Sequence, residues 1–144
     1  MVNLAKDRPV SSSEKDPILG TLSMITDGDK EATEGSYVEM GPGVQWVTID
    51  LGKSHAIHAI AIWHYHGQAR VYHDIVVQFC DDPDFIEDVC TVFNNDQDNS
   101  AGQGAGEDLG YWESFEGKVI EAGGQKARFV RLFSNGSTSD DQNH

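Results

Sequence analysis

The sequence predicts an all-β domain, an antiparallel β-sandwich jelly roll, on three observations. Apolar and polar residues alternate over short segments, turn residues separate these segments, and almost no stretch has helical periodicity. The eight segments with this alternation are Ser36–Met40, Gln45–Leu51, Ile57–Tyr65, Tyr72–Cys80, Val89–Phe93, Tyr111–Phe115, Lys118–Ala122 and Ala127–Ser134. Eight short strands in one chain are typical of an antiparallel sandwich, for which we expect under about 15% helix.

The segments between these strands are rich in turn-forming residues, as in GPG, LGK, HGQ, DDPD, EGK and AGGQ. Asp81–Glu87 could hold one helical turn. Two connections, Thr26–Gly43 and Asn94–Gly110, are long and acidic, and loops of this length are usually functional or disordered. The second has oxygen-bearing side chains at 94, 96, 98 and 100, like half of an EF-hand, but it lacks the later Gly and Glu. We therefore favour a solvated loop that could still contact a ligand.

Length and charge limit the classes of protein to consider. The 144 residues and 15.8 kDa fit one domain with its own core, which we take as residues 1–144. A net charge of −14 argues against nucleic-acid partners and anionic membranes, which would repel the chain. No apolar run approaches the ~18 residues of a membrane span. The first residues lack the apolar core of a signal peptide, so we expect a module excised from a larger, secreted protein.

The two cysteines, Cys80 and Cys90, flank the segment CDDPDFIEDVC. They would lie near the end of one strand and the start of the next, where a disulfide across the connection is geometrically feasible. In a reducing compartment they would remain thiols. The sequence leaves both states open.

An unusual cluster of polar and aromatic residues, HYHGQARVYH, follows the apolar run that starts at Ile57. Strand alternation places Ile60, Ile62, His64 and His66 on one face, so the chain leaves the core near residue 64. Two imidazoles at this spacing could share a metal, but the nearest third donor, His73, lies across a turn. No serine–histidine–carboxylate relay or acid/base carboxylate pair is evident. We therefore expect that the protein is not an enzyme.

Five motifs together carry a family resemblance. In chain order they are NLAKDRPVSSS, ITDGDKEAT, QWVTIDLGK, VVQFCDDPDF and KARFVRLFS. Their order and spacing resemble the discoidin family, also called factor V/VIII type C domains, and within it the family 32 carbohydrate-binding modules. The resemblance covers essentially the whole chain and implies a galactose-binding-like β-sandwich. The family's final strand would follow SNGSTSDDQNH, so we expect that strand to be missing from this chain.

The resemblance also implies a structural calcium ion in the DGD loop. Carried over, Asp27 and Asp29 would supply carboxylates, while Met24 and Ala32 (or Thr33) would supply backbone carbonyls. Calcium takes 6–8 hard oxygen ligands in flexible geometry. An ordinary Asp-Gly turn without an ion is the alternative, and the missing strand would leave the site incomplete.

The resembling sugar-binding modules place their site at one end of the sandwich. There a histidine, an arginine and an amide or carboxylate typically hold hydroxyl groups, while an aromatic ring stacks on the sugar. The residues of this chain that match these types are His64, His66, Arg70, Tyr72, Tyr37, Glu39, Asp96 and Trp112. The alternative is that His64 is a satisfied, half-buried histidine; we expect Trp63 and Trp46 to be packing residues.

The function that the resemblance implies is that of a non-catalytic carbohydrate-binding module. It would target a catalytic domain of the same polypeptide to a poly- or oligosaccharide in the extracellular or periplasmic space. The alternative is a protein or cell-surface adhesion module of discoidin type. Lipid-binding relatives carry apolar spikes with basic rims, and we expect none in this acidic chain.

Overall fold

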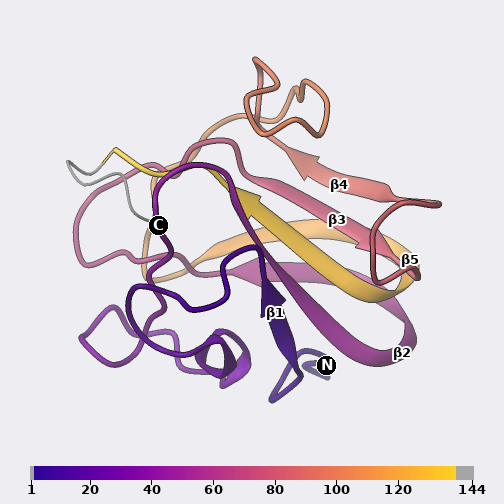
Figure 1. Cartoon of the computed structure of the whole chain (residues 1–144), viewed down its shortest axis with the longest axis horizontal. Helices are drawn as coiled ribbons and strands as arrows, with labels where there is room; N and C mark the ends of the chain where they lie inside the picture. Colours follow the sequence, from indigo (N-terminus) through magenta and orange to yellow (C-terminus); the bar gives the residue numbers. More distant parts are fainter. Residues whose placement is uncertain (1, 139–144) are drawn as a thin grey trace.

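The computed structural model describes residues 2–138 and confirms the predicted all-β class (Figure 1). Its five strands form one antiparallel sheet in the order β1-β2-β5-β3-β4. Their bounds are Val10–Ser12 for β1, Gln45–Ile62 for β2, Val76–Cys80 for β3, Cys90–Asn94 for β4 and Lys118–Ser134 for β5. A short 3₁₀ helix, η1, covers Leu22–Thr26. Among the described residues, no helix is long and apolar enough to cross a membrane.

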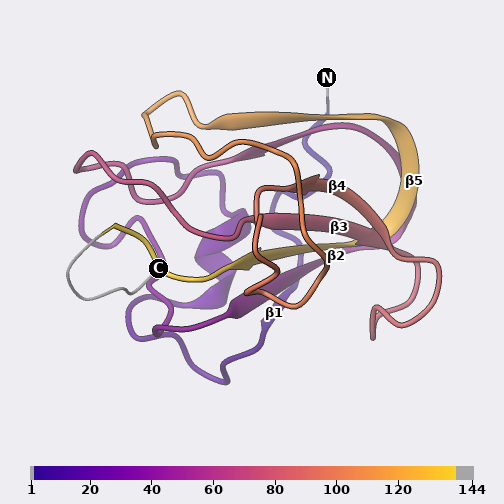
Figure 2. The same cartoon turned by 90° about the horizontal axis from the view of Figure 1, so that it is seen from above.

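The two layers of the sandwich arise because two long strands bend together. β2 and β5 pair from Gln45↔Ser134 to Ile62↔Lys118, with register shifts between Asp50 and His55 and between Ile57 and Ala59. Gly52 in β2 and Gly123 and Gly124 in β5 have φ values of 87°, 63° and 82°, which glycine adopts without steric cost. Figure 2 shows the sheet turning back over itself at this bend.

The bend explains why fewer strands are present than predicted. Gln45–Leu51 and most of Ile57–Tyr65 belong to one strand, β2, which ends at Ile62 rather than at Tyr65. Lys118–Ala122 and Ala127–Ser134 likewise form one strand, β5. The glycines resemble turns in the sequence, but the ladder resumes after each irregularity, as it does across a β-bulge.

Two other predicted strands are irregular segments. Ser36–Met40 contains an isolated bridge between Leu19 and Glu39 in place of a strand. Tyr111–Phe115 lies beside another loop instead of joining the sheet, and its Glu113 amide donates to the Arg70 carbonyl at 3.1 Å. Residues 139–144, to which the expectation of a missing final strand relates, lie outside the described part of the chain.

The core lies between the two layers, and β2 follows the predicted alternation from Ala59 onward. A register shift between Ile57 and Ala59 brings Ile57, which strict alternation would place on the other face, into the same core. Ile57 and Ile62 are buried, Ile60 is partly buried and packs against them, and Ala61 between them is exposed. β3 is buried along its whole length because the layers cover one face and a loop covers the other. That loop is Asn94–Gly110, whose Ala101 packs on Val76 and Phe133. The loop that we expected to be solvated is therefore anchored on the sheet.

Cys80 and Cys90 are both free thiols. Phe79 is the residue opposite Cys90, so Cys90 shares a sheet face with Phe79, and Cys80 points to the other face. The Cys80 thiol instead donates to the Glu87 carbonyl at 3.0 Å. Side chains that point to opposite faces cannot be bridged without backbone movement.

Candidate functional site

The candidate site lies at the end of the sandwich opposite the bends of β2 and β5, on the left in Figure 1. Two loops, 63–73 and 110–117, run side by side there. The Trp63 indole donates to the Phe115 carbonyl at 3.0 Å, and the Glu113 amide donates to the Arg70 carbonyl at 3.1 Å. The first loop contains the polar and aromatic stretch that the sequence singled out, so the strand does leave the core where predicted.

A buried carboxylate fixes the first predicted residue, His64. Its Nδ1 lies 2.9 Å from Oε1 of Glu113, whose side chain is 1% exposed, against 19% for His64. The imidazole also stacks on the ring of Tyr72, with 4.4 Å between ring centroids. With Nδ1 engaged and one face covered, His64 is held in one orientation and keeps Nε2 for another partner. The sequence analysis missed Glu113, which belongs to no motif and fell within a predicted strand.

The second predicted residue, Arg70, is held over an aromatic ring. Its guanidinium carbon lies 4.7 Å from the centroid of Tyr65, and its Nη2 donates to Gln68 at 3.3 Å. The Nε atom is buried and has no hydrogen-bond partner. Burial raises the pKa of the Tyr72 phenol, and a hydrogen bond from Arg70 opposes that rise. Tyr65, which the sequence analysis did not select, is thus central to the cluster.

A third segment reaches this cluster from the acidic loop Thr26–Gly43. The ring of Tyr37 packs edge-on against Tyr65 at 5.0 Å, and Lys30 lies 4.6 Å from the centroid of Trp63. Burial and nearby carboxylates, including Glu39, raise the pKa of Tyr37. We call the residues Tyr37, His64, Tyr65, Arg70, Tyr72 and Glu113 the end cluster.

His66 and Tyr72 have mainly internal contacts. His66 Nδ1 donates to the carbonyl of His64 at 3.1 Å, which leaves its Nε2 as the other polar atom. Tyr72 is 6% exposed and lies beneath His64, so its ring supports the histidine rather than presenting a face for stacking. The backbone amide and carbonyl of Glu39 form hydrogen bonds with the carbonyl and amide of Leu19. The charge of Glu39 is one of the causes that raise the pKa of Tyr37.

Trp112 projects from the second loop and is 67% exposed. Leu109 and Phe115 of the same segment are also largely exposed, whereas Tyr111 and Glu113 face inward. The segment therefore exposes apolar side chains. The expectation that this chain lacks apolar spikes with basic rims, as lipid-binding relatives have, stays a prediction. Their neighbours in the sequence include the acidic Glu107, Asp108 and Glu116, while the ammonium of Lys118 lies 5.1 Å from the ring centroid of Tyr111.

Asp96 is a predicted ligand residue that the structure buries instead of exposing to a ligand. It is fully buried, and its two carboxylate oxygens accept the amides of Ser100 and Ala101, both at 2.9 Å. One carboxylate oxygen of Asp96 and one each of Asp74 and Asp98 lie within 4.8 Å of one another. The carboxylate organises the Asn94–Gly110 loop rather than facing solvent.

The Thr26–Thr33 loop is built on its two predicted carboxylates. Asp27 Oδ1 accepts the Asp29 amide at 2.8 Å, and Asp29 Oδ1 accepts the Glu31 amide at 3.0 Å. Hydrogen bonds to the Asp29 carboxylate, from the Glu31 amide first and then from the Ser36 side chain, hold the pKa of Asp29 below its ordinary value. Met24 lies in η1 immediately before the loop, and Ala32 is half-buried near its end.

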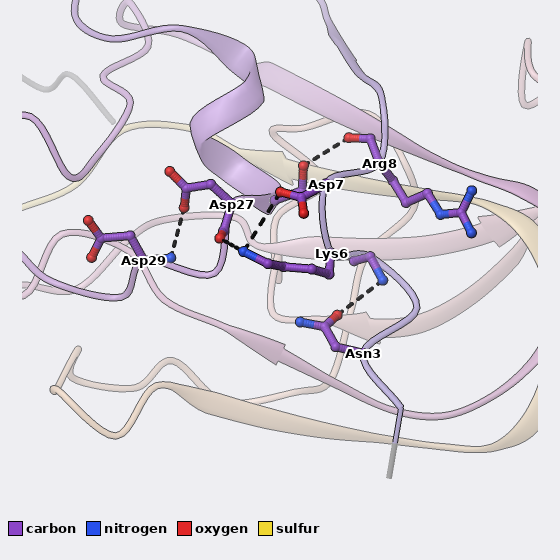
Figure 3. A network of polar contacts seen from close by, with 8 residues as sticks. Asn3, Lys6, Asp7, Arg8, Asp27 and Asp29 are labelled. Carbon is purple, nitrogen blue, oxygen red and sulfur yellow. Dashed lines mark hydrogen bonds and ion pairs between the residues drawn. The ribbon is translucent and has the colours of Figure 1, made fainter.

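A cation already lies against this loop. The ammonium of Lys6 donates to the backbone carbonyl of Asp27 and lies 3.7 Å from Oδ1 of Asp7 (Figure 3). Carbonyl and carboxylate oxygens are the hard donors that calcium prefers. The loop therefore holds a positive charge among oxygen atoms of the kind that calcium takes as ligands.

The fold was compared with solved structures. CpGH89CBM32-4, produced by Clostridium perfringens, superposes with a TM-score of 0.68 at 20% identity, over 99% of this chain and 91% of its own. The CBM32 of AlyQ, solved in complex with 4,5-unsaturated mannuronic acid, has a TM-score of 0.60 at 17% identity, over 94% and 88%. Chitosan-binding module 1 of a chitosanase/glucanase from Paenibacillus sp. IK-5 has a TM-score of 0.57 at 15% identity, over 96% and 90%.

These similarities confirm the fold that the sequence motifs implied, the galactose-binding-like β-sandwich of family 32 carbohydrate-binding modules. No family model matches the sequence, and no curated protein matches it. The similarity therefore lies in the fold, whereas the function has to be argued from the residues of the end cluster.

Proposed function

Because the chain has the fold of family 32 carbohydrate-binding modules, we propose that it is a non-catalytic carbohydrate-binding module that binds a glycan at the end cluster. The observation that carries the proposal is the pair formed by His64 and the buried Glu113. A buried carboxylate is costly unless it is paired, and here its partner is a half-buried imidazole at the surface end of the sandwich. Such an arrangement suits a side chain that has to be held ready for a ligand.

The chemistry of the cluster matches that of a sugar. Sugars present vicinal hydroxyl groups together with an apolar C–H face, so a site needs fixed polar groups and a flat aromatic surface. His64 and Arg70 supply polar atoms on side chains that Glu113 and Tyr65 hold in place. The 3.3 Å hydrogen bond from Arg70 to the exposed Gln68 is long, so a ligand hydroxyl could replace it at little cost.

The stacking surface is provided by Trp112. It is the most exposed of the aromatic residues selected from the sequence, and the adjacent Glu113 ties its backbone to Arg70. Exposed aromatic rings that rim a polar cluster usually mark a contact surface. His66 and Glu39 complete the rim as secondary polar contacts, whereas Asp96 is buried within the Asn94–Gly110 loop.

We place the module in a secreted protein, next to a catalytic domain of the same chain, in the extracellular or periplasmic space. One structure with this fold is a truncated AlyQ that holds CBM32 and alginate lyase domains, in which the matched module is 29% of that chain. Other solved complexes name a mannuronic acid derivative and GlcNAc-α-1,4-galactose as ligands. Glycans of these classes are therefore the first candidates.

The test is affinity electrophoresis against neutral, cationic and anionic polysaccharides, alongside a glycan array. Wild-type protein should be retarded by at least one glycan, and His64→Ala should lose that retardation while melting cooperatively. Ile86→Ala is the control, because it truncates a largely exposed side chain outside the two loops of the site. Equal retardation of wild type and His64→Ala would reject the end cluster as the site.

Protein or cell-surface adhesion is the second candidate function. The observation in its favour is the exposed apolar set of Leu109, Trp112 and Phe115, which resembles a protein contact surface as much as a sugar platform. A pull-down from extracellular matrix, run beside the glycan array, separates the two. Capture of a defined matrix protein without any glycan signal would favour adhesion.

The calcium ion is a separate part of the proposal. Asp27 and Asp29 would supply carboxylates, and the carbonyls of Met24 and Ala32 would supplement them, as the family resemblance implies. Calcium bound there would hold the loop that carries Lys30 and Tyr37 to the site. The contribution is structural, because the loop positions side chains for binding.

A further inference from the structure

Lys6 occupies a position that is unusual for an exposed lysine. Its ammonium is directed back onto the Thr26–Thr33 loop, where it donates to the Asp27 carbonyl, and a Cβ built on Gly28 would lie 3.0 Å from its Nζ (Figure 3). The carboxylate of Asp7 lies 3.7 Å away on the other side. The lysine is thus held between two oxygen groups on the face of the loop.

The backbone of the Lys6 segment is fixed on the same loop. The Asp7 amide donates to the Thr26 carbonyl at 2.8 Å, and the Thr26 hydroxyl donates to the Arg8 carbonyl at 2.8 Å. Figure 3 shows that the Arg8 guanidinium points away from the loop, so Lys6 is the cation of this segment that reaches it. The lysine is therefore placed by the fold rather than by chance contact of a free side chain.

We propose that Lys6 is a built-in counter-ion of the Thr26–Thr33 loop and that it competes with calcium for the oxygen atoms there. The inference rests on the calcium site proposed above and adds a residue that sets its affinity. The Asp27 carbonyl already accepts from the lysine, and the carboxylates of Asp27 and Asp29 lie on the same short loop. An ammonium and a divalent ion this close repel one another.

The expected size of the effect follows from Coulomb's law. A unit charge about 5 Å from a divalent ion, in a dielectric close to that of water, disfavours the ion by on the order of tenfold. The Lys6 side chain is 50% exposed, so it can also swing into solvent when calcium arrives. Lys6 would then stabilise the loop when calcium is scarce and yield to it when calcium is abundant.

The experiment is calorimetric titration of EDTA-treated protein with calcium chloride, with melting curves recorded at the same time. Lys6→Gln should bind calcium about tenfold more tightly than wild type, and Lys6→Arg, which keeps the charge, should resemble wild type. Without calcium, Lys6→Gln should melt below wild type because the loop has lost its cation. Lys6→Met, which keeps the alkyl chain, should behave like Lys6→Gln.

Two control variants test whether the effect is specific to Lys6 and whether the ion binds at Asp29. Lys126→Gln removes one positive charge from β5, and an equal gain in calcium affinity there would overturn the proposal by showing a general charge effect. Asp29→Asn in the Lys6→Gln background should abolish binding, whereas retained binding would place the ion elsewhere and overturn the proposal. If wild type and Lys6→Gln bind calcium with equal affinity, the role of Lys6 is rejected but the calcium site is kept. Absence of calcium binding in both would reject the calcium site as well, without bearing on glycan binding.

Discussion

Glu113 lies 2.9 Å from Nδ1 of His64 although its own side chain is almost completely buried. The two residues are 49 positions apart in the sequence and come from two loops that end at different strands. The contact fixes the tautomer of the imidazole, because a carboxylate oxygen accepts the Nδ1 proton and leaves Nε2 as the remaining polar atom. The pair therefore converts a flexible loop histidine into an oriented one.

Replacing Glu113 with Gln should weaken glycan binding by about tenfold without removing the fold. Glutamine fills the same volume but loses the charge that holds His64, so the imidazole is free to adopt the other tautomer. Calorimetry against the glycan that wild type retains measures the loss. Glu116→Gln, an exposed change in the same loop, should leave the affinity unchanged. Wild-type affinity in Glu113→Gln would show that the pair serves only packing.

Replacing Arg70 with Ala should weaken binding by roughly 10- to 150-fold, because a hydrogen bond to a charged group contributes about 1.5–3 kcal/mol. Arg70→Lys should recover little of it, since an ammonium cannot reproduce the planar stack on Tyr65. His66→Ala should cost less than Arg70→Ala, because one nitrogen of His66 is already bound to the His64 carbonyl. Calorimetry with melting curves as the folding control decides among these outcomes.

The parts of the fold that could be predicted from the sequence are those set by residues close together in the chain. Alternation correctly predicts that Ile60 and Ile62 face the core and that Ala61 does not, because period-2 geometry is local. It does not predict that Ile57 enters the same core, because a register shift separates Ile57 from Ala59. The end of that strand near His64 also follows from the change to polar residues. The merging of four of the segments into two long bent strands did not follow, because a glycine such as Gly52 or Gly123 occurs in bends and in turns alike.

The site was predicted in part for the same reason. His64, His66 and Arg70 stand together in one stretch, so the sequence identifies them as a group. Glu113 gains its role from a contact across the fold, and no local pattern marks it. Tyr65 stands in the same stretch as the predicted residues, but its place beneath Arg70 follows only from the folded loop. Asp96 looks like a ligand in an acidic loop, but the packing of Ala101 on the sheet buries it.

The bidentate pair of Asp50 and Arg128 should make stability depend on pH in the acid range. Arg128 donates to both carboxylate oxygens, at 2.9 and 3.1 Å, and this contact holds the pKa of Asp50 below its ordinary 3.8. A lowered pKa in the folded state gives stability that is present above pH 3.8 and is lost as the pH falls through the lower, folded value. Asp50→Asn should therefore lose less of its melting temperature than wild type between pH 5 and about pH 3. Identical acid profiles would show that the pair is too solvated to matter.

Calcium should raise the melting temperature of the wild-type protein, and EDTA should lower it, because an ion that binds only the native state stabilises it by mass action. At one hundred times its Kd a ligand contributes about 2.7 kcal/mol. Asp29→Ala should abolish the difference between calcium and EDTA. An unchanged response in that variant would move the ion from the Thr26–Thr33 loop, and Asp98→Ala would then test the carboxylates grouped with Asp96.

The last prediction concerns the exposed ring of Trp112. A ring that is 67% exposed contributes little to folding, so Trp112→Ala should change the melting temperature only slightly. The same substitution should weaken glycan binding by at least tenfold, because an aromatic ring at a binding surface supplies a large contact area and specific stacking geometry. Quenching or shift of tryptophan fluorescence on adding the glycan gives a direct readout.

Phe115→Ala is the matched variant, since Phe115 is 77% exposed on the same loop and Trp63 holds its backbone carbonyl. If the ligand is a short glycan seated against His64 and Arg70, Phe115→Ala should bind as wild type does. Of the two aromatic residues, Trp112 is the one directly next to Glu113 in the sequence. If both variants lose binding to the same extent, the contact surface extends along the whole loop, as a protein partner would require. A Trp112→Ala protein that folds and binds the glycan like wild type would remove Trp112 from the site and leave the polar residues of the end cluster as its only support.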